Sequence, residues 1–296
     1  MRLDELFLKS AVIEPLQWPT FEKAGLDVHV LREDLRHPWA GGNKAWKLRH
    51  NLEAYYHSGK EAMLSFGGAY SNHLLALSSV CNWMGIPFHA VIRGEERPVN
   101  SRIMKMIEQG THIHYCSRSD YRKRKDELTL KELLSECCQD IPAADELFVI
   151  PEGGDNTFGI KGCTDMAGLI PSDANQVWMA CGTGCTLLGM RIGLEPAIRA
   201  VGVPVVRNFQ ELTEKMQREV ASTAWQLLDG YQEGGYGKSS PRLEHFINTF
   251  SGVTGVPLEP TYTGKLFFAL DDQAGKNMIQ RGTKIIVLHS GGVFQE

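Results

Sequence analysis

The sequence predicts an α/β protein with two lobes, built on open, twisted, mostly parallel sheets that carry helices on both faces. Short apolar runs recur along the chain, and segments long enough to be helices separate them. Neighbouring parallel strands need crossover connections of this kind. The length of 296 residues is a further observation, because it suits one large domain or two modest domains that share a cleft.

Seven short apolar runs are the predicted strands. They cover residues 62–66, 87–92, 111–115, 147–150, 176–180, 200–205 and 284–289. Between them, apolar residues spaced three apart over 74–83 predict a helix, and a second helix is expected over 101–108. This order predicts a smaller domain over residues 52–152, inserted into a larger domain made of residues 1–51 and 153–296.

Composition argues against several classes of protein. The net charge of −4 gives no reason to expect nucleic acid or an anionic membrane as a partner. No apolar stretch approaches the roughly 18 residues that span a bilayer, and the charged start over 1–5 lacks the apolar segment of a signal peptide. The seven irregularly spaced cysteines predict free thiols in a reducing cytoplasm, and no histidine or cysteine cluster has the spacing of a zinc site, so no metal is expected.

Lys44 is the first candidate for chemistry. It follows the Gly-Gly-Asn turn at 41–43 and opens a segment with helical periodicity. If a lysine at such a junction points into a cleft, desolvation lowers the pKa of its amine. A neutral amine can condense with an aldehyde, and pyridoxal phosphate is the commonest aldehyde cofactor that uses a protein lysine in this way. A solvated lysine at an ordinary helix start is the alternative.

Two glycine-rich turns follow predicted strands. After Gly67-Gly68 come Ser71, Asn72 and His73, at a helix N-terminus whose free N–H groups attract a carboxylate; Ser71 or Asn72 would equally serve as a simple helix cap. The second turn reads Cys181-Gly182-Thr183-Gly184-Cys185-Thr186. Its backbone amides and threonine hydroxyls suit a phosphate, and a plain strand-to-helix turn is the alternative.

A dinucleotide site is less consistent with the second turn. Its fingerprint needs a third glycine, where this chain has Leu187, and an acidic residue about 20 positions beyond the glycine loop. Residues 203–205 stand there instead, and they read Val-Pro-Val. The turn therefore favours a phosphate group over a dinucleotide.

Hydroxyl groups also gather near the C-terminus of the chain. Tyr262 and Thr263 precede a predicted helix, and Ser290 follows the last predicted strand. Phenols and hydroxyls at such positions suit local proton transfer and hydrogen bonds to a ring nitrogen. Tyr236, within a Gly-Gly-Tyr-Gly turn, is a further candidate, although an exposed turn tyrosine explains it equally.

Taken in order, these motifs resemble the 1-aminocyclopropane-1-carboxylate deaminase and D-cysteine desulfhydrase family, which are fold-type II pyridoxal phosphate enzymes related to tryptophan synthase β. The matches run over nearly the whole chain. They are Arg32-Glu33-Asp34-Leu35, Gly41-Gly42-Asn43-Lys44, Gly67-Gly68-x-x-Ser71-Asn72-His73, Pro151-Glu152-Gly153-Gly154, Gly182-Thr183-Gly184-x-Thr186, Tyr262-Thr263-Gly264-Lys265 and His289-Ser290-Gly291-Gly292. The resemblance implies a two-lobed homodimer that binds pyridoxal phosphate and a small amino acid.

The resemblance also implies a role for each position. Lys44 would hold the cofactor covalently, Asn72 would bind its 3-hydroxyl and Thr263 would face its pyridine nitrogen. The implied catalytic residues are Lys44, Ser71, Tyr236 and Tyr262. The implied cofactor contacts are Lys44, Asn72, Cys181, Gly182, Thr183, Gly184, Cys185, Thr186, Thr263 and Ser290. The implied substrate contacts are Ser71, Asn72, His73, Tyr236 and Tyr262.

Thr263 and Ser290 bear on the substrate. Deaminases of the family carry glutamate at the position of Thr263, where a carboxylate favours a protonated ring and a strong electron sink, and they tend to carry leucine at that of Ser290. A neutral threonine hydroxyl stabilises a charged ring less. Elimination from D-cysteine needs less stabilisation, because thiolate is a good leaving group. The resemblance thus favours β-elimination to pyruvate and ammonia. Deamination of 1-aminocyclopropane-1-carboxylate, serine or threonine dehydration, and a catalytically silent relative stay open.

Two residues depart from the family pattern. Trp46 stands where family members often carry arginine, and Cys185 stands where a glycine is usual in the phosphate loop. The first change is expected to alter a salt bridge or a contact on the phosphate side. The second is expected to narrow the approach of the backbone to a phosphate.

Overall fold

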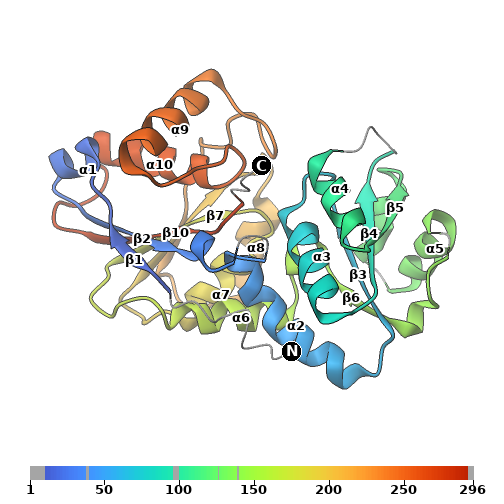
Figure 1. Cartoon of the computed structure of the whole chain (residues 1–296). Coiled ribbons are helices and arrows are strands. Elements are labelled where there is room, and N and C mark those ends of the chain that lie inside the picture. The colour runs from blue at the N-terminus through green and yellow to red at the C-terminus, as the bar shows by residue number, and fades with distance from the viewer. Residues whose placement is uncertain (1–10, 38–39, 96–99, 126, 139, 293–296) are drawn as a thin grey trace.

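The computed structural model describes residues 11–37, 40–95, 100–125, 127–138 and 140–292. In this part of the chain, two sheets lie in two lobes that stand side by side (Figure 1). No helix among the described residues is long and apolar enough to cross a membrane. The charged segment 1–5, which argued against a signal peptide, lies outside the described residues.

The larger lobe is built on a sheet of six strands in the order β1-β2-β10-β7-β8-β9. All neighbours in it are parallel except β1 and β2, which pair antiparallel at one edge. The strands are β1 (Ile13–Pro15), β2 (Asp27–Arg32), β7 (Gln176–Cys181), β8 (Arg199–Pro204), β9 (Trp225–Leu227) and β10 (Lys284–His289).

Helices cover both faces of this sheet, because its central strands are apolar on both sides. In β10, Ile285 and Val287 contribute to one core, whereas Ile286 and Leu288 contribute to the other. The first core is closed by α1 (Pro19–Ala24), α9 (Pro241–Thr254) and α10 (Thr263–Gly275). The second is closed by α6 (Thr157–Ala167), α7 (Cys185–Gly193) and α8 (Gln210–Glu219).

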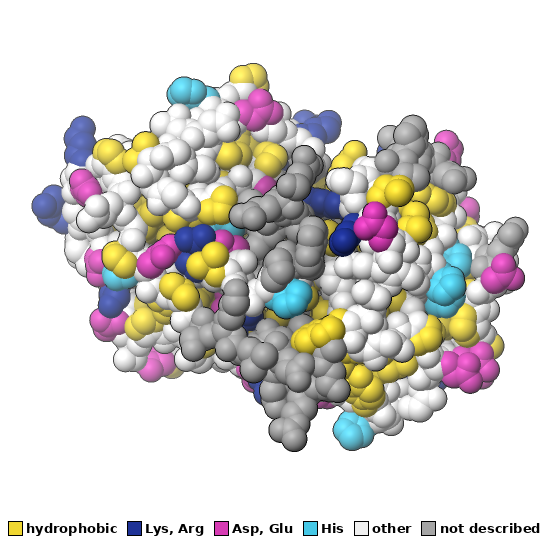
Figure 2. All heavy atoms as spheres, in the orientation of Figure 1, with side chains coloured by type: hydrophobic (Ala, Val, Ile, Leu, Met, Phe, Trp, Pro, Cys, Tyr) yellow, Lys and Arg dark blue, Asp and Glu magenta, His cyan; other side chains and the backbone are white. Residues whose placement is uncertain are grey.

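The smaller lobe has a wholly parallel sheet in the order β5-β4-β3-β6. Its strands are β3 (Ala62–Gly67), β4 (Phe88–Arg93), β5 (His112–Cys116) and β6 (Leu147–Ile150). One face packs against α3 (Asn72–Met84) and α4 (Ser101–Glu108), and the other packs against α5 (Glu127–Cys137). The seven cysteines of the chain are free thiols. Over the face drawn in Figure 2, basic and acidic side chains are interspersed.

Helix α2 (Asn43–Ser58) runs between the two lobes and brings Lys44 to their junction (Figure 1). Its N-cap, Gly42, has a φ of +73°, which favours glycine. A Cβ at this position would lie 2.0 Å from the carbonyl oxygen of Ser290. Only glycine therefore lets the start of α2 pass against the loop that follows β10.

The fold class and the seven predicted strands are confirmed, as are the helices predicted over 74–83 and 101–108. Three strands were not predicted: β1, β2 and β9. In β2, His29 interrupts the buried Val28, Val30 and Leu31, so the strand lacks a continuous apolar run. The four strands of the smaller sheet lie between residues 62 and 150. The domain limits at 52 and 152 stay a prediction.

Trp46 takes part in a buried ion-pair network. Its indole Nε1 donates to Glu33 Oε2 at 2.8 Å, and Arg36 donates to both oxygens of the same carboxylate at 2.7 Å. The Arg36 guanidinium also lies 5.2 Å from the centre of the Trp46 ring. The tryptophan that replaces the family's arginine thus adds a donor to a carboxylate that Arg36 already neutralises.

We expect Glu33→Gln to lower the free energy of unfolding by about 3 kcal/mol, because it removes the carboxylate charge that pairs with the buried Arg36 guanidinium. Urea unfolding would measure this, with the exposed Glu132→Gln as the control, for which we expect a change within about 0.5 kcal/mol. A loss below about 1 kcal/mol for Glu33→Gln would show that the network adds little to stability.

Candidate active site

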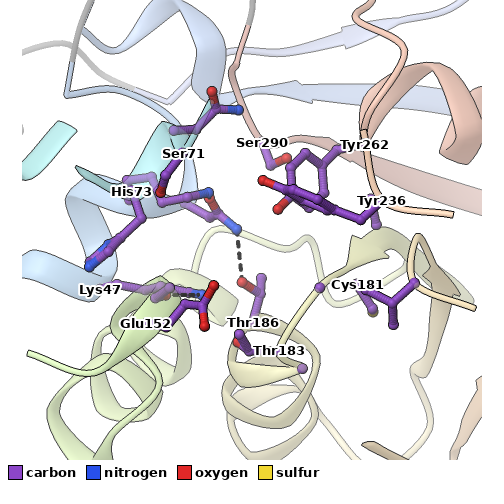
Figure 3. Close-up of a pocket in the computed structure, with 18 of the residues that line it drawn as sticks. Lys47, Ser71, His73, Glu152, Cys181, Thr183, Thr186, Tyr236, Tyr262 and Ser290 are labelled. Atoms are coloured by element: carbon purple, nitrogen blue, oxygen red, sulfur yellow. Dashed lines mark hydrogen bonds between the residues drawn. The ribbon is translucent and has the colours of Figure 1, made fainter. Parts of the chain in front are cut away.

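A cavity of about 280 Å³ opens at the junction of the lobes (Figure 3). It is lined from α2, from the turn before α3, from the loop between β7 and α7, and from the loops before α10 and after β10. Twelve predicted site residues line it: Lys44, Ser71, Asn72, His73, Cys181, Gly182, Thr183, Gly184, Thr186, Tyr236, Tyr262 and Ser290. Cys185 and Thr263 are buried behind the wall rather than in it.

Lys44 has the properties expected of an amine that reacts with an aldehyde. Its Nζ donates to Asn43 Oδ1, and Asn43 Nδ2 in turn donates to Thr186 Oγ1 at 2.8 Å. Burial, followed by the nearby charge of Lys47, lowers the pKa of Lys44 to about 7. A large fraction of the amine is therefore neutral near pH 7.

Lys47 lines the cavity, although the sequence motifs did not predict it as a site residue. Its side chain is 5% exposed, and its Nζ donates to the carbonyl oxygen of Gly153 at 2.9 Å. Residues three apart on a helix share a face, so the spacing of Lys44 and Lys47 was the available signal. Arg93 also lines the cavity and stood in no predicted motif, whereas Asn43 and Glu152 line it from motifs of the resemblance that assigned them no role. In Figure 3, Lys47 and Glu152 lie across the cavity from Tyr262 and Ser290.

The loop from Cys181 to Thr186 connects β7 to the N-terminus of α7. Gly184 is the N-cap of α7, so the free N–H groups of the first helical turn lie beside Thr183 and Thr186. Such N–H groups and hydroxyls bind phosphate, and Lys47 adds a positive charge. Cys185 Sγ contacts the carbonyl oxygen of Gly154 at 3.4 Å and does not line the cavity. Its side chain therefore does not obstruct the loop from the cavity side.

Ser71 combines the two functions that its sequence position suggested. It is the N-cap of α3, where its Oγ accepts a hydrogen bond from the Leu74 N–H at 3.2 Å, and it also lines the cavity. Accepting this bond leaves the hydroxyl proton of Ser71 able to donate to a bound group. The helix cap and a ligand contact are thus compatible.

His73 is held as a neutral imidazole. The Ser65 hydroxyl donates to the carbonyl oxygen of Ile150 at 2.7 Å, so it accepts from His73 Nε2, which lies 3.0 Å away. Burial, followed by the charges of Lys47 and Lys44, lowers the pKa of His73 to about 3. Its Nδ1 is a buried acceptor that has no hydrogen-bond partner among the described residues.

Two tyrosines form the wall opposite α2. The rings of Tyr236 and Tyr262 meet edge to face with their centres 5.8 Å apart, and Lys44 Nζ lies 5.9 Å from the centre of the Tyr262 ring. Burial raises the pKa of both phenols, so they are neutral at pH 7 and keep their protons for donation.

Thr263 is fully buried at the start of α10, beside a carboxylate that was not predicted. Its Oγ1 accepts from the Glu259 N–H at 3.0 Å, and Glu259 Oε1 accepts from the Thr263 N–H at 2.8 Å. The Glu259 carboxylate also accepts from the N–H groups of Thr261 and Tyr262, each at 2.7 Å. An acidic residue ahead of a predicted helix was the available signal, because carboxylates cap helix N-termini.

These groups fit pyridoxal phosphate. A neutral amine is available for its aldehyde, backbone N–H groups with Lys47 suit its phosphate, and the Asn72 amide suits its ring oxygen. Among the described residues, no group of three histidine, cysteine or acidic side chains is arranged to hold a metal ion.

Comparisons with known proteins agree with this fit. A family model described as pyridoxal-phosphate dependent enzyme matches residues 13–291. The chain is 28% identical to a protein of Pyrococcus horikoshii that is provisionally named 1-aminocyclopropane-1-carboxylate deaminase, over 97% of this chain and 94% of that protein. It is 24% identical to the bifunctional D-cysteine desulfhydrase/1-aminocyclopropane-1-carboxylate deaminase of Arabidopsis thaliana, over 91% of this chain and 73% of that protein.

Solved structures give the same result. The crystal structure of a 1-aminocyclopropane-1-carboxylate deaminase homologue matches with a TM-score of 0.82 and 27% identity, over 97% of this chain and 91% of that one. A hydrogen sulfide-producing enzyme of Fusobacterium nucleatum shares the fold at a TM-score of 0.69 and 16% identity, over 100% of this chain and 99% of that one. The resemblance that the motifs indicated is confirmed: the chain belongs to the pyridoxal-phosphate dependent enzymes, among relatives of 1-aminocyclopropane-1-carboxylate deaminase and D-cysteine desulfhydrase.

Proposed function

We propose that this enzyme catalyses β-elimination from a small D-amino acid. D-cysteine is the favoured substrate, and with one water it would give pyruvate, ammonia and hydrogen sulfide. The observation that carries this choice is the neutral hydroxyl of Thr263, which stands where the family's deaminases carry glutamate. Both oxygens of the nearby Glu259 carboxylate accept from N–H groups of the first turn of α10. That carboxylate is therefore committed to the helix cap.

When bound, pyridoxal phosphate supplies the aldehyde that the substrate amine attacks and a conjugated ring that takes up electrons from the α-carbon. Lys44 Nζ would accept the α-proton, and its lowered pKa suits a base that works near neutral pH. The β-substituent then leaves. A thiolate leaves readily, so elimination needs no strong electron sink, in keeping with a threonine rather than a carboxylate at position 263.

The remaining cavity residues hold the reactants in place. Ser71 and the N-terminus of α3 suit the substrate carboxylate, because the Ser71 hydroxyl proton is available and the helix end attracts anions. Tyr236 and Tyr262 cover the cavity from the opposite side. The loop from Cys181 to Thr186 and Lys47 hold the phosphate.

A substrate comparison tests the proposal. We expect the purified holoenzyme to release pyruvate and sulfide from D-cysteine, and to release pyruvate from L-cysteine or L-serine at less than about a hundredth of that rate. The wrong enantiomer directs its α-hydrogen away from Lys44, which is the physical reason for the difference. Turnover of 1-aminocyclopropane-1-carboxylate alone would refute the elimination, and turnover of L-serine alone would indicate a dehydratase.

Deamination of 1-aminocyclopropane-1-carboxylate is the second candidate, because the relatives from Pyrococcus horikoshii and Thermotoga maritima are provisionally named for it. The proposal also includes a homodimer in a reducing cytoplasm. The seven free thiols support the reducing compartment, and the family resemblance supports the dimer. Light scattering of the purified protein would measure the oligomeric state.

A further inference from the structure

Arg102 reaches the cavity wall from the smaller lobe. It lies in the first turn of α4, and its Nη1 donates to Asn72 Oδ1 at 2.7 Å and to the carbonyl oxygen of Tyr70. Asn72 lines the cavity, whereas Arg102 stands behind it and is half-buried. Arg102 therefore acts on the cavity through Asn72 rather than by direct contact with a ligand.

The position of Arg102 is fixed by a second side chain. Asn100 is the N-cap of α4, where its Oδ1 accepts from the N–H groups of Arg102 and Ile103, both at 3.0 Å. Its Nδ2 donates to the carbonyl oxygen of Ala69 at 3.0 Å. One asparagine thus ties the start of α4 to the turn that precedes α3, and this tie places the guanidinium beside Asn72.

The contact with Arg102 also determines which end of the Asn72 amide faces it. A guanidinium only donates hydrogen bonds, so the amide oxygen must point to Arg102 and the NH₂ group must point away. The NH₂ group then lies toward Gly292, where an added Cβ would come within 2.7 Å of Nδ2. Glycine at this position leaves room for the amide, on the side of the cavity that Ser290 lines.

We propose that Arg102 is a positioning residue, which holds the Asn72 amide with its NH₂ group available to the ring hydroxyl of pyridoxal phosphate and so favours the ionised form of that hydroxyl. The inference rests on the proposed function and on the fit described above, in which the Asn72 amide suits this hydroxyl. A donor stabilises an ionised oxygen, whereas an amide oxygen turned toward it would repel that form. The guanidinium charge further polarises the amide NH₂ group and strengthens its donation.

Arg102→Met keeps the length of the side chain and removes its donors, so the amide is free to turn. We expect the dissociation constant of pyridoxal phosphate, measured on the apoprotein, to rise about tenfold. We also expect the pH midpoint between the visible and near-ultraviolet absorption bands of the bound cofactor to move upward by about one unit, because the ionised hydroxyl loses its donor. Arg102→Lys, which restores a charged donor, should recover part of both effects.

Lys105→Met is the matched control, since it removes a cation one turn further along α4, where the ammonium lies 3.3 Å from Glu108. It should change neither quantity. If Arg102→Met keeps the wild-type midpoint and affinity, the proposal is overturned, even if urea unfolding shows a loss of stability. In that case the proposed function stands. If the wild-type apoprotein binds no pyridoxal phosphate, the function proposed for Arg102 and the proposed function of the enzyme are both wrong.

Discussion

Lys44→Ala is expected to reduce turnover at least about 10³-fold and to abolish covalent attachment of the cofactor, because this amine serves as both attachment point and base. After borohydride reduction, the mass of the wild-type protein should increase by one pyridoxyl phosphate group, whereas that of Lys44→Ala should not change. The exposed Lys161→Ala on α6 is the control, and it should behave as the wild type. A reduced adduct on Lys44→Ala would place the attachment point on another lysine.

The pH dependence of cofactor uptake gives a second readout of Lys44. Only the neutral amine attacks an aldehyde, and burial lowers the pKa of Lys44 to about 7. The rate at which apoprotein takes up pyridoxal phosphate should therefore rise as the pH increases through about 7 and level off above it. A rise centred near the ordinary pKa of lysine would show that this amine is solvated, and the proposed site would then be wrong.

Lys47→Met is expected to weaken binding of pyridoxal phosphate by about 10- to 100-fold, because a hydrogen bond to a charged group contributes about 1.5–3 kcal/mol. It should also move the uptake profile to higher pH. The positive charge of Lys47 lowers the pKa of Lys44, so its removal raises that pKa and leaves more of the amine protonated near pH 7. Equilibrium titration and stopped-flow absorption would measure the two effects.

Lys47→Arg keeps the charge and should preserve the position of the uptake profile, although a bulkier guanidinium will bind phosphate with different geometry. Unchanged affinity and an unchanged profile in Lys47→Met would contradict both functions that we give to Lys47. A lower affinity with an unchanged profile would support the contact of Lys47 with the phosphate and contradict its effect on the pKa of Lys44.

The fold followed from the sequence where the signal was local. A continuous apolar run marks a buried strand wherever it lies, and seven such runs are strands in the structure. β2 was not predicted because His29 interrupts its short apolar run, and β9 because three residues carry little pattern. Only the pairing of β2 with β1 and β10 shows that it belongs to the larger sheet.

The order of polar residues at strand ends was likewise visible in the chain, because parallel strands present their C-terminal ends at one edge of a sheet. It identified the turn before α3 and the loop after β7, whereas the Gly-Gly-Asn turn before a helical segment identified Lys44, and all three now line one cavity. It did not identify Lys47, whose only signal is its spacing from Lys44. It also placed Thr263 at the cavity, whereas the structure buries its hydroxyl against Glu259.

The sequence by itself determined which reactive side chains this protein has. It also determined that these side chains lie at strand ends and at glycine turns. The tertiary structure alone decided which partner holds each of them. Asn43 and Thr186 are hydrogen-bonded across 143 positions, and Arg102 and Asn72 across 30. Neighbours in the folded chain set the orientation of the Asn72 amide, the pKa of the Lys44 amine and the hydrogen bonds of the Glu259 carboxylate. The packing of the chain brings hydrogen-bonded neighbours within about 3 Å. Local pattern carries no information on such neighbours.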